Sequence, residues 1–514
     1  MTRTRFASSH GRPLRRAPPR SRRIPAREAR GCARQSAWHD DALFLCRTFE
    51  HPVTNSATFT YQDLLAIAGR AAASLPQDIA VCGVSTDSRS IAPSNIFIAL
   101  RGERFDGHDH VEQALANGAV CCGVERAYAE TAPADVVARC IVVDDTLHLL
   151  GSFGWYHRQR FEIPVIAIGG AAGKTSTKDL TAHVLSQSMS VLKTQANYNN
   201  RIGTPHTLLQ LTADHDVAVI EIGTNEPGEI ETLTAMVQPT HGLITNIDKE
   251  HLEKLIDLDG VEHEECTLFA WLADVGGLAL INIDDERLQK YVVYNPRHVT
   301  FALDTPANLR PTVEFDDALR PTLSLVMNDF TLRARMQATG LAAARNAVCA
   351  MAVAYALRVP APVVNHGLET YELSSGHGYA RMVVQHVGGF TVLNDCYNAN
   401  PASMKLALET LRRYPASMRV AVLGDMRELG SAEDVEHQAM LDAATQCADL
   451  VIVLGDAFRR AAIMLDRPHV VVCETHHGCA QALKEHAAAD AAVLVKGSRG
   501  MTMERIIETL ATPQ

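Results

Sequence analysis

The feature that most constrains this chain is an apolar run that ends in a glycine-rich turn and continues into Lys174 and Thr175. Residues 163–168 predict a buried strand, and residues 178–188 predict a helix. Small residues in such a turn let backbone N–H groups approach phosphate oxygens, and the helix N-terminus adds partial positive charge. The spacing Gly170-x-x-Gly173-Lys174-Thr175 is shorter than the common Walker pattern but keeps its strand–turn–helix context.

A phosphate-binding loop of this kind assigns roles to its residues. Lys174 would reach the terminal phosphates of a nucleotide, and the Thr175 hydroxyl would bind Mg²⁺. The other predicted ATP-binding residues of the loop are Gly170, Ala171, Ala172, Gly173 and Ser176. The alternative is an ordinary strand-to-helix turn with a solvated lysine, and the local context favours nucleotide binding over it.

Length and composition limit the class of protein. A chain of 514 residues is too long for one core, so roughly two to four domains are expected. A net charge of −11 argues against a general nucleic-acid binder, and no apolar run is long enough to span a membrane. The 12 cysteines form no Cys-x-x-Cys pair, which favours free thiols in a reducing compartment. We therefore expect a cytoplasmic protein.

The first segment differs from the rest of the chain. Residues 1–34 hold 11 arginines and one acid, a composition that cannot bury a core, so a disordered extension is predicted over 1–52. A transit peptide, a basic arm that binds nucleic acid, and upstream sequence from a misplaced start are all open. No methionine lies between Met1 and Met189, and we favour a misplaced start slightly over targeting.

Residues 53–158 alternate strands and helices and predict a small α/β domain. Thr60 is placed to cap its first helix. Two loops gather polar groups, and they contain the residues Ser88, Arg89, Asp106, Gly107 and His108. Turn chemistry with a surface ion pair and donors for a diphosphate or sugar are near-even interpretations of these loops.

The central region, 159–372, contains two polar residues that lie within or just after predicted apolar strands. Glu221 lies in the apolar strand predicted over 216–222, where an unpaired acid is costly unless it binds a metal. His251 follows the strand predicted over 242–247, and ligands collect at the carboxyl ends of parallel strands. Taken alone, His251 would be a surface residue at a helix start. Residues 311–338 predict a β-meander, and 341–357 predict a closing helix.

A linker is predicted over 358–376, and the last region, 373–514, predicts a Rossmann-like parallel sheet. Its predicted strands are 390–393, 419–423, 450–454, 469–473 and 492–495. Three polar loops follow such strands, at the edge where open α/β sheets bind ligands. Turns and helix caps would also explain their Asp, Asn, Ser and Gly content.

These loops make the pattern specific. They read Tyr397-Asn398-Ala399-Asn400-Pro401, Gly424-Asp425-Met426 with Glu428-Leu429-Gly430, and Lys496-Gly497-Ser498-Arg499. Over about residues 55–510 the chain resembles the Mur ligase family and, within it, the MurF type. The amino-acid-adding ligase that acts one step earlier shares the Asp87-Ser88-Arg89 domain. It lacks these loops and usually carries an Asp-Asn-Pro-Arg motif, which is absent here.

The resemblance implies a fold, an activity and substrates. It implies an α/β protein of three domains: UDP-sugar binding over 53–158, ATP binding over 159–372, and a C-terminal ligase domain over 373–514. The implied substrates are ATP with Mg²⁺, UDP-N-acetylmuramoyl-tripeptide and D-Ala-D-Ala. ATP would phosphorylate the peptide carboxylate, the D-Ala-D-Ala amine would attack the acyl phosphate, and phosphate would leave. Lys174 and Mg²⁺ would offset the charge of the transferring phosphoryl group, and the positioning of the reactants would account for most of the remaining catalysis. We expect a monomer without nucleic-acid partners.

The resemblance also implies residue roles. Thr175 and Glu221 would hold one Mg²⁺ and His251 a second, while Lys174, Glu265 and His251 would be catalytic. Asn346, Arg381 and Asp395 would contact ATP. The remaining residues implied in substrate binding are Asn200, Asn398, Asn400, Lys496, Ser498 and Arg499, together with the five residues of the two N-terminal loops.

Four departures from the family pattern stand out. Ala171-Ala172 replaces side-chain donors before Gly173, and the family's His-Asn-x-x-Asn reads Ala342-Ala343-Ala344-Arg345-Asn346. The lysine that is carbamylated in the family aligns with Glu265, and the acid usually two residues on is Thr267. A glutamate supplies a carboxylate without carbamylation, so we hypothesise that Glu265 takes over the metal role.

Two functions of different classes follow. The first is an active ATP-dependent ligase, and the second is a degenerate homologue that binds nucleotide or UDP-sugar without ligating. The presence of Lys174, Thr175, Glu221 and His251 favours the first. The third residue of the tripeptide, diaminopimelate or lysine, is left open by the sequence.

Overall fold

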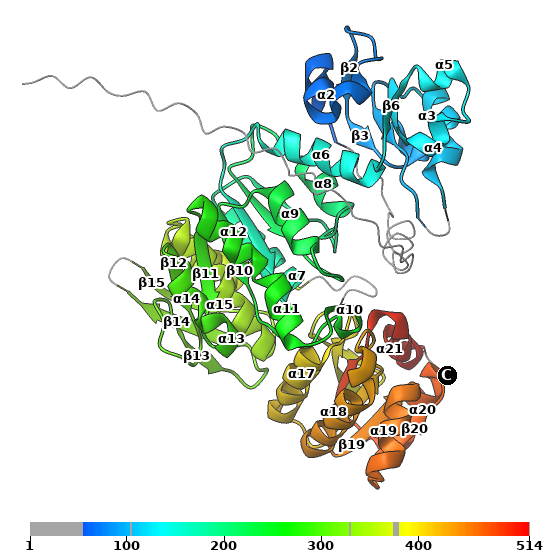
Figure 1. The fold of residues 1–514 in the computed structure, drawn as a ribbon. Coiled ribbons are helices and arrows are strands. Elements are labelled where there is room, and N and C mark those ends of the chain that lie inside the picture. Colours follow the sequence, from blue (N-terminus) through cyan, green and yellow to red (C-terminus); the bar gives the residue numbers. More distant parts are fainter. Residues whose placement is uncertain (1–54, 103–104, 328–329, 374–379, 513–514) are drawn as a thin grey trace, which may run out of the picture.

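The computed structural model describes residues 55–102, 105–327, 330–373 and 380–512 (Figure 1). The predicted Arg-rich extension and the end of the predicted linker lie outside these ranges. Figure 1 shows the described chain as three α/β units along an elongated molecule, with the first and last units at opposite ends. Among the described helices, none combines the length and apolar character that crossing a bilayer requires.

The first unit is built on a small parallel sheet. Its strands run in the order β3 (Val84–Ser85), β4 (Ile96–Ile98), β5 (Cys121–Glu125) and β6 (Cys140–Val143), beside the antiparallel pair β1 (Thr58–Thr60) and β2 (Ala80–Cys82). Its helices are α2 (Tyr61–Ala68), α3 (Val111–Ala116), α4 (Arg126–Ala129), α5 (Ala134–Val137), α6 (Thr146–Arg158) and the short η1 (Gly69–Ala72), η2 (Ser88–Ser90) and η3 (Gly107–His110). Thr60 caps α2 as predicted, in a reciprocal capping box with Asp63.

The second unit contains a six-stranded parallel sheet in the order β12-β11-β10-β7-β9-β8. The strands are β7 (Val165–Gly169), β8 (Val191–Lys193), β9 (Val217–Glu221), β10 (His241–Ile244), β11 (Leu278–Asn282) and β12 (His298–Phe301). Ile166 and Ile168 of β7 pack into one hydrophobic cluster, and Val165 and Ala167 pack into another. Both faces of β7 are therefore buried, which explains its unbroken apolar sequence.

Helices cover both faces of this sheet, and α7 and α15 pack against each other. The helices are α7 (Lys174–Ser186), α8 (Gly203–Leu208), α9 (Glu229–Val237), α10 (Leu252–Leu255), α11 (Leu258–Glu265), α12 (Thr267–Val275), α13 (Glu286–Gln289), α14 (Tyr291–Tyr294), α15 (Leu341–Ala356) and α16 (Ala361–Thr370). The predicted meander is present as the antiparallel sheet β13 (Thr312–Phe315), β14 (Pro321–Val326) and β15 (Thr331–Arg335).

The linker predicted over 358–376 is wrong over most of its length, because Ala361–Thr370 form α16. Val364 and Leu368 are fully buried in the central core, and a Cβ on Gly367 would lie 2.7 Å from the Cα of Val184. The glycine therefore marks a close helix–helix approach, and the prolines lie at the start of the helix, where the missing N–H costs little. The helix of the phosphate loop also begins earlier than predicted, at Lys174.

The third unit is a six-stranded sheet in the order β16-β17-β21-β18-β19-β20. The strands are β16 (Val383–Val387), β17 (Phe390–Asp395), β18 (Arg419–Gly424), β19 (Leu450–Leu454), β20 (Val470–Cys473) and β21 (Ala492–Lys496). The helices are α17 (Pro401–Arg413), α18 (Glu433–Cys447), α19 (Asp456–Leu465), α20 (His476–His486), α21 (Glu504–Ala511) and the short η4 (Gly430–Ala432) and η5 (Arg499–Met501). The sheet is parallel as predicted except for the unpredicted edge strand β16, which pairs antiparallel with β17.

The turn after α10 stores strain at Ile256. This β-branched residue has φ +75° and ψ −60°, and it is 80% exposed. Replacing Ile256 by glycine is expected to raise the free energy of unfolding by about 1 kcal/mol, because glycine adopts this conformation without strain. Urea unfolding would measure it. Ile256→Ala, which removes the side chain but keeps a Cβ, is the control and should give a smaller gain. An unchanged or lower stability for the glycine variant would contradict the assignment of strain.

Candidate active site

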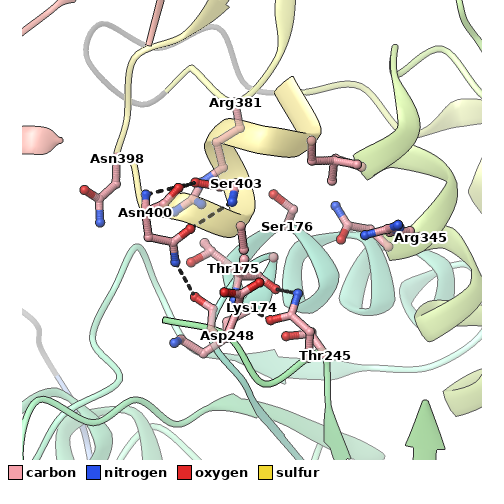
Figure 2. A pocket seen from close by; sticks show the side chains of 18 of the residues that line it. Lys174, Thr175, Ser176, Thr245, Asp248, Arg345, Arg381, Asn398, Asn400 and Ser403 are labelled. Carbon is pink, nitrogen blue, oxygen red and sulfur yellow. Dashed lines mark hydrogen bonds between the residues drawn. The ribbon is translucent and has the colours of Figure 1, made fainter. Parts of the chain in front are cut away.

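A cavity of about 1540 Å³ lies between the second and third units. The second unit contributes the phosphate loop and the ends of its central strands, and the third contributes the loops after β17, β18 and β21. Figure 2 shows Lys174 and Thr175 of the phosphate loop below Asn398 and Asn400 of the loop after β17. β17, β21 and β18 are neighbours in the sheet, so their three loops meet at one edge as predicted. The cavity is the site toward which most of the predicted residues converge.

The phosphate loop is held from beneath. Gly170 has φ +112°, and a Cβ there would lie 2.3 Å from the Thr245 hydroxyl oxygen, so only glycine fits. The Ala171 N–H donates to the backbone oxygen of Asn246, and the Ala172 N–H donates to the Asn246 side-chain oxygen, both over 2.9 Å. The Gly170 N–H donates to Glu265 Oε2. These three N–H groups therefore bond to protein, and the donors left for an anion are those of the residues that follow.

Those donors belong to the start of α7. Gly173 is its N-terminal cap at φ +86°, and within the described chain no side chain caps this turn. The first N–H groups of a helix have no partner inside the helix, so Lys174, Thr175 and Ser176 present theirs to the cavity. Uncapped N–H groups and the helix dipole together favour bound phosphate.

Lys174 lies in an acidic surrounding. Its Nζ is 3.1 Å from Glu250 Oε2, and the Glu250 side chain is buried. Burial alone would lower the pKa of Lys174, but the negative charges of Glu250 and Glu265 outweigh it and raise that pKa. Lys174 is therefore a fixed positive charge at the mouth of the loop, and Glu250 is a partner that a phosphate would compete with.

Thr175 contacts Glu221, and the family resemblance assigns these two residues to one Mg²⁺. The Thr175 hydroxyl donates to Glu221 Oε1 over 3.0 Å, and Asn199 Nδ2 donates to the same oxygen over 2.8 Å. Glu221 Oε2 is buried without a hydrogen-bond partner among the described residues, and Lys178 Nζ lies 3.8 Å from it. A buried carboxylate with one oxygen to spare, beside a hydroxyl, suits Mg²⁺, which takes one or two protein carboxylates and fills its shell with phosphate oxygens and water.

His251 reaches across to the third unit. Its Nδ1 lies 2.7 Å from Glu428 Oε2, and its backbone is left-handed at φ +47°. Burial alone would lower the pKa of His251, but the hydrogen bond to Glu428 and nearby negative charge raise it. Over the described residues no group of three or more His, Cys, Asp or Glu side chains is arranged around one ion position. The second metal role of His251 stays a prediction.

Two further contacts join the second and third units beside the cavity. Asn400 Nδ2 donates to the Ala171 oxygen over 3.2 Å, and Lys249 forms an ion pair with Glu436. Asn400 also caps α17 by accepting from the Ser403 N–H. The predicted substrate residue Asn400 thus links the phosphate loop to the last unit.

Glu265 lies directly under the phosphate loop. Its side chain is fully buried, and Oε2 accepts from the Gly170 N–H over 2.7 Å. Burial raises the pKa of Glu265 to about 8. Oε1 of Glu265 and Oε1 of Glu250 are both buried without a hydrogen-bond donor in the part of the chain described. Neighbouring acids serve elsewhere: Glu264 accepts from the N–H groups of Gly228 and Ile230 at the start of α9, and Glu262 pairs with Arg287.

The predicted residues of the third unit form a connected network on the cavity wall. Lys496 Nζ bonds to Asp395 Oδ2 over 2.7 Å and to the Asn398 oxygen over 2.9 Å. The Ser498 hydroxyl accepts from the Arg427 N–H and donates to the Ala399 oxygen. Two cations lie at its edge. The Arg499 guanidinium pairs with Glu504, and that of Arg381 stacks 4.0 Å from the centroid of the Tyr397 ring.

Two predicted asparagines have local partners. Asn346 Oδ1 accepts from the Thr177 hydroxyl over 3.2 Å, beside the end of the phosphate loop. Asn200 Oδ1 accepts from the N–H groups of Ile202 and Gly203 at the start of α8. Both line the cavity, but the asparagine that touches Glu221 is Asn199, which the sequence analysis missed.

The predicted residues of the first unit do not line this cavity in the described chain. Arg89 pairs with Asp87 over 2.8 Å, and Ser88 is buried in η2. His108 Nδ1 lies 2.5 Å from Asp106 Oδ1, and its Nε2 accepts from the Glu125 N–H. Gly107 is needed where it is, because a Cβ would lie 2.8 Å from the Leu100 oxygen. Their role in binding a UDP-sugar stays a prediction.

Three Mur ligase family models match this chain. The model of the Mur ligase middle domain matches residues 168–354, that of the Mur ligase glutamate ligase domain matches 380–499, and that of the Mur ligase family catalytic domain matches 80–153. The UDP-N-acetylmuramoyl-tripeptide–D-alanyl-D-alanine ligase of Escherichia coli K12 is 31% identical over 84% of this chain and 94% of its own. The Synechocystis enzyme of that name is 35% identical over 71% and 77%.

Solved structures agree with these relatives. A crystal structure of MurF from Acinetobacter baumannii superposes with a TM-score of 0.79 at 28% identity, covering 89% of this chain and 99% of that one. MurF from Thermotoga maritima in complex with ADP shares the fold, with a TM-score of 0.74 at 23% identity over 83% and 96% of the two chains. The chain belongs to the Mur ligase family and, within it, to the MurF type.

Proposed function

We propose that this chain is an ATP-dependent ligase that adds D-alanyl-D-alanine to UDP-N-acetylmuramoyl-tripeptide in the synthesis of peptidoglycan precursors. The observation that carries the proposal is the uncapped first turn of α7, with Lys174 and the Thr175–Glu221 contact, opening into a cavity shared with the last unit. Such a site can hold a nucleotide's phosphates on one wall and a second substrate on the other. The non-ligating alternative has no observation in its favour.

In this proposal the second unit binds the phosphates of the nucleotide and offsets their charge. The N–H groups at the start of α7 and the Lys174 ammonium bind the phosphates and stabilise the charge on the group being transferred. Thr175 and Glu221 would hold Mg²⁺, which when bound would neutralise part of the phosphate charge. Glu250 keeps Lys174 in place until phosphate arrives, and Asn199 and Lys178 orient Glu221. Glu265 and His251 are the other proposed catalytic residues of this unit.

The remaining predicted residues would bind the substrates. The incoming amine would bind at the cavity wall that contains Asn398, Lys496, Ser498 and Arg499. ATP would contact Asp395, Arg381 and Asn346. The five residues of the first unit would bind the UDP-sugar. The proposal includes three domains, at about 53–158, 159–372 and 373–514. It also includes a cytoplasmic location and a monomeric state.

The experiment is a ligation assay on the full chain. It is incubated with ATP, Mg²⁺, UDP-N-acetylmuramoyl-tripeptide and D-Ala-D-Ala, and the amide product is identified by mass spectrometry. Lysine and diaminopimelate tripeptides are compared. Product that requires ATP and both substrates supports the proposal. Tight nucleotide binding without product from either tripeptide would instead indicate a homologue that binds but does not ligate.

A further inference from the structure

Arg345 lines the cavity and has no hydrogen-bond or ion-pair partner among the described residues. Six arginines line the cavity, and five of them contact a carboxylate, a backbone oxygen or an aromatic ring: Arg287, Arg381, Arg413, Arg427 and Arg499. Within the described residues Arg345 makes no hydrogen bond or ion pair, and its side chain is exposed to the cavity. A guanidinium left unpaired in a cavity is available to a ligand.

Its position points to the nucleoside end of the nucleotide. The phosphates belong at Gly173–Ser176, with the terminal one toward Lys174 and Glu221. Asn346, the next residue of α15, bonds to Thr177, and a Cβ on Gly173 would lie 3.0 Å from its Oδ1. Figure 2 shows Arg345 projecting from α15 on the other side of the view from Asn398 and Asn400. A nucleotide whose reacting end faces the last unit would extend its base along α15.

Apolar residues contribute to the cavity lining on α15 and in the segments after β12 and β15. Ala342 and Ala343 on the first turn of α15 offer no side-chain donor. β12, which packs against α15, contributes Phe301, and the segments that follow β12 and β15 contribute Leu303 and Met336. Two of the acids that line the cavity have hydrogen-bond partners: Asp284 accepts from the Leu303 and Thr305 N–H groups, and Asp285 accepts from the Ile247 and Arg287 N–H groups. Apolar side chains and an unpaired guanidinium in one cavity suit a purine ring.

Chemistry decides which purine edge a guanidinium matches. Its planar fork donates two parallel hydrogen bonds and accepts none. A 6-oxopurine such as guanine presents two adjacent acceptors, N7 and O6, whereas adenine presents one acceptor, N7, beside a donor. We propose that Arg345 recognises the base of the nucleotide and makes this site accept a guanine nucleotide as well as an adenine one. This inference rests on the proposed nucleotide-dependent function.

The test is isothermal titration of the full chain with Mg²⁺ and either ADP or GDP. Wild type is expected to bind GDP within about tenfold of ADP. Arg345→Ala should weaken GDP binding by about tenfold or more, and ADP binding by less than about threefold, because only guanine loses two bonds. Arg345→Lys keeps the charge without the fork and should resemble the alanine variant. Arg333→Ala, an exposed arginine on β15 outside the cavity, is the matched control and should change neither.

Three results would overturn the inference. Wild type that binds ADP but rejects GDP by more than about a hundredfold would show that the site does not accept guanine. Equal weakening of ADP and GDP in Arg345→Ala, restored by lysine, would make Arg345 a phosphate contact. Binding of neither nucleotide would remove the proposed function along with this inference, which distinguishes the two failures.

Discussion

Replacing Lys174 by methionine is expected to lower the rate of ligation by about 10³-fold or more. Methionine keeps much of the side chain's length and apolar stem but removes the ammonium that faces Glu250 at 3.1 Å. The transferring phosphoryl group then loses its fixed positive charge, and Glu250 is left as an uncompensated negative charge where phosphate must bind. Single-turnover amide formation measures the effect on the chemical step, and titration with ADP measures the effect on binding.

The control for this substitution is Lys484→Met, an exposed lysine on α20 outside the cavity, which should retain wild-type ligation. Thermal unfolding of both variants separates a catalytic defect from a folding defect. Ligation by a folded Lys174→Met variant within about tenfold of wild type would mean that the loop does not act on the transferred group.

Replacing Glu265 by glutamine is expected to lower ligation by about a hundredfold or more while leaving the protein folded and able to bind nucleotide. The amide oxygen of glutamine can still accept from the Gly170 N–H, so the loop keeps its support. What is lost is the carboxylate whose second oxygen, like one of Glu250, is buried without a hydrogen-bond donor in the described part of the chain. Wild-type ligation should not respond to added bicarbonate, because a glutamate needs no carbamylation.

Glu262→Gln is the matched control, since Glu262 lies on the same helix but pairs with Arg287 rather than with the phosphate loop. It should ligate normally. Normal ligation by Glu265→Gln would reject the metal role of Glu265 and leave it as a support for the phosphate loop. Bicarbonate stimulation of wild type would point to a carbamylated residue elsewhere.

The same substitution should change the pH dependence of stability. Burial raises the pKa of Glu265 to about 8 in the folded protein, above its value when unfolded. The folded state therefore holds the proton more tightly, and its stability falls as pH rises from about 4.5 to 8. Relative to Glu265→Gln, nucleotide-free wild type should lose on the order of a few kcal/mol over this range. Urea unfolding at several pH values measures the difference, and parallel curves for the two proteins would contradict the assignment.

The parts of the site that could be predicted from sequence are those with a local signature. The strand, the glycines and Lys174 predict the phosphate loop. Hydrophobic periodicity and the backbone freedom of glycine can both be recognised in a short stretch of neighbouring residues. The three C-terminal loops could be placed because each follows an apolar strand, and parallel strands end at a common edge. Glu221 was found because an acid inside an apolar strand is costly without a partner.

The parts that could not be predicted depend on contacts between distant residues. Glu250 stands in a polar run, and only the fold brings it to Lys174, 76 positions earlier. Asn199 and Asn200 are adjacent and chemically identical, so nothing local says which one reaches Glu221. The α16 segment reads as a linker because of its prolines and Gly367, but its apolar face is buried against α7 and the central core. Tertiary burial overrode the local signal there.

The measurement that tests the central claim most directly is an isotope transfer. The claim is that the cavity between the phosphate loop and the last unit activates a carboxylate by phosphorylation. UDP-N-acetylmuramoyl-tripeptide labelled with ¹⁸O in the reacting carboxylate is converted with ATP and D-Ala-D-Ala, and the inorganic phosphate released is analysed by mass spectrometry. The account predicts that one labelled oxygen moves from the carboxylate to phosphate for each amide formed. Amide formation with unlabelled phosphate would contradict it.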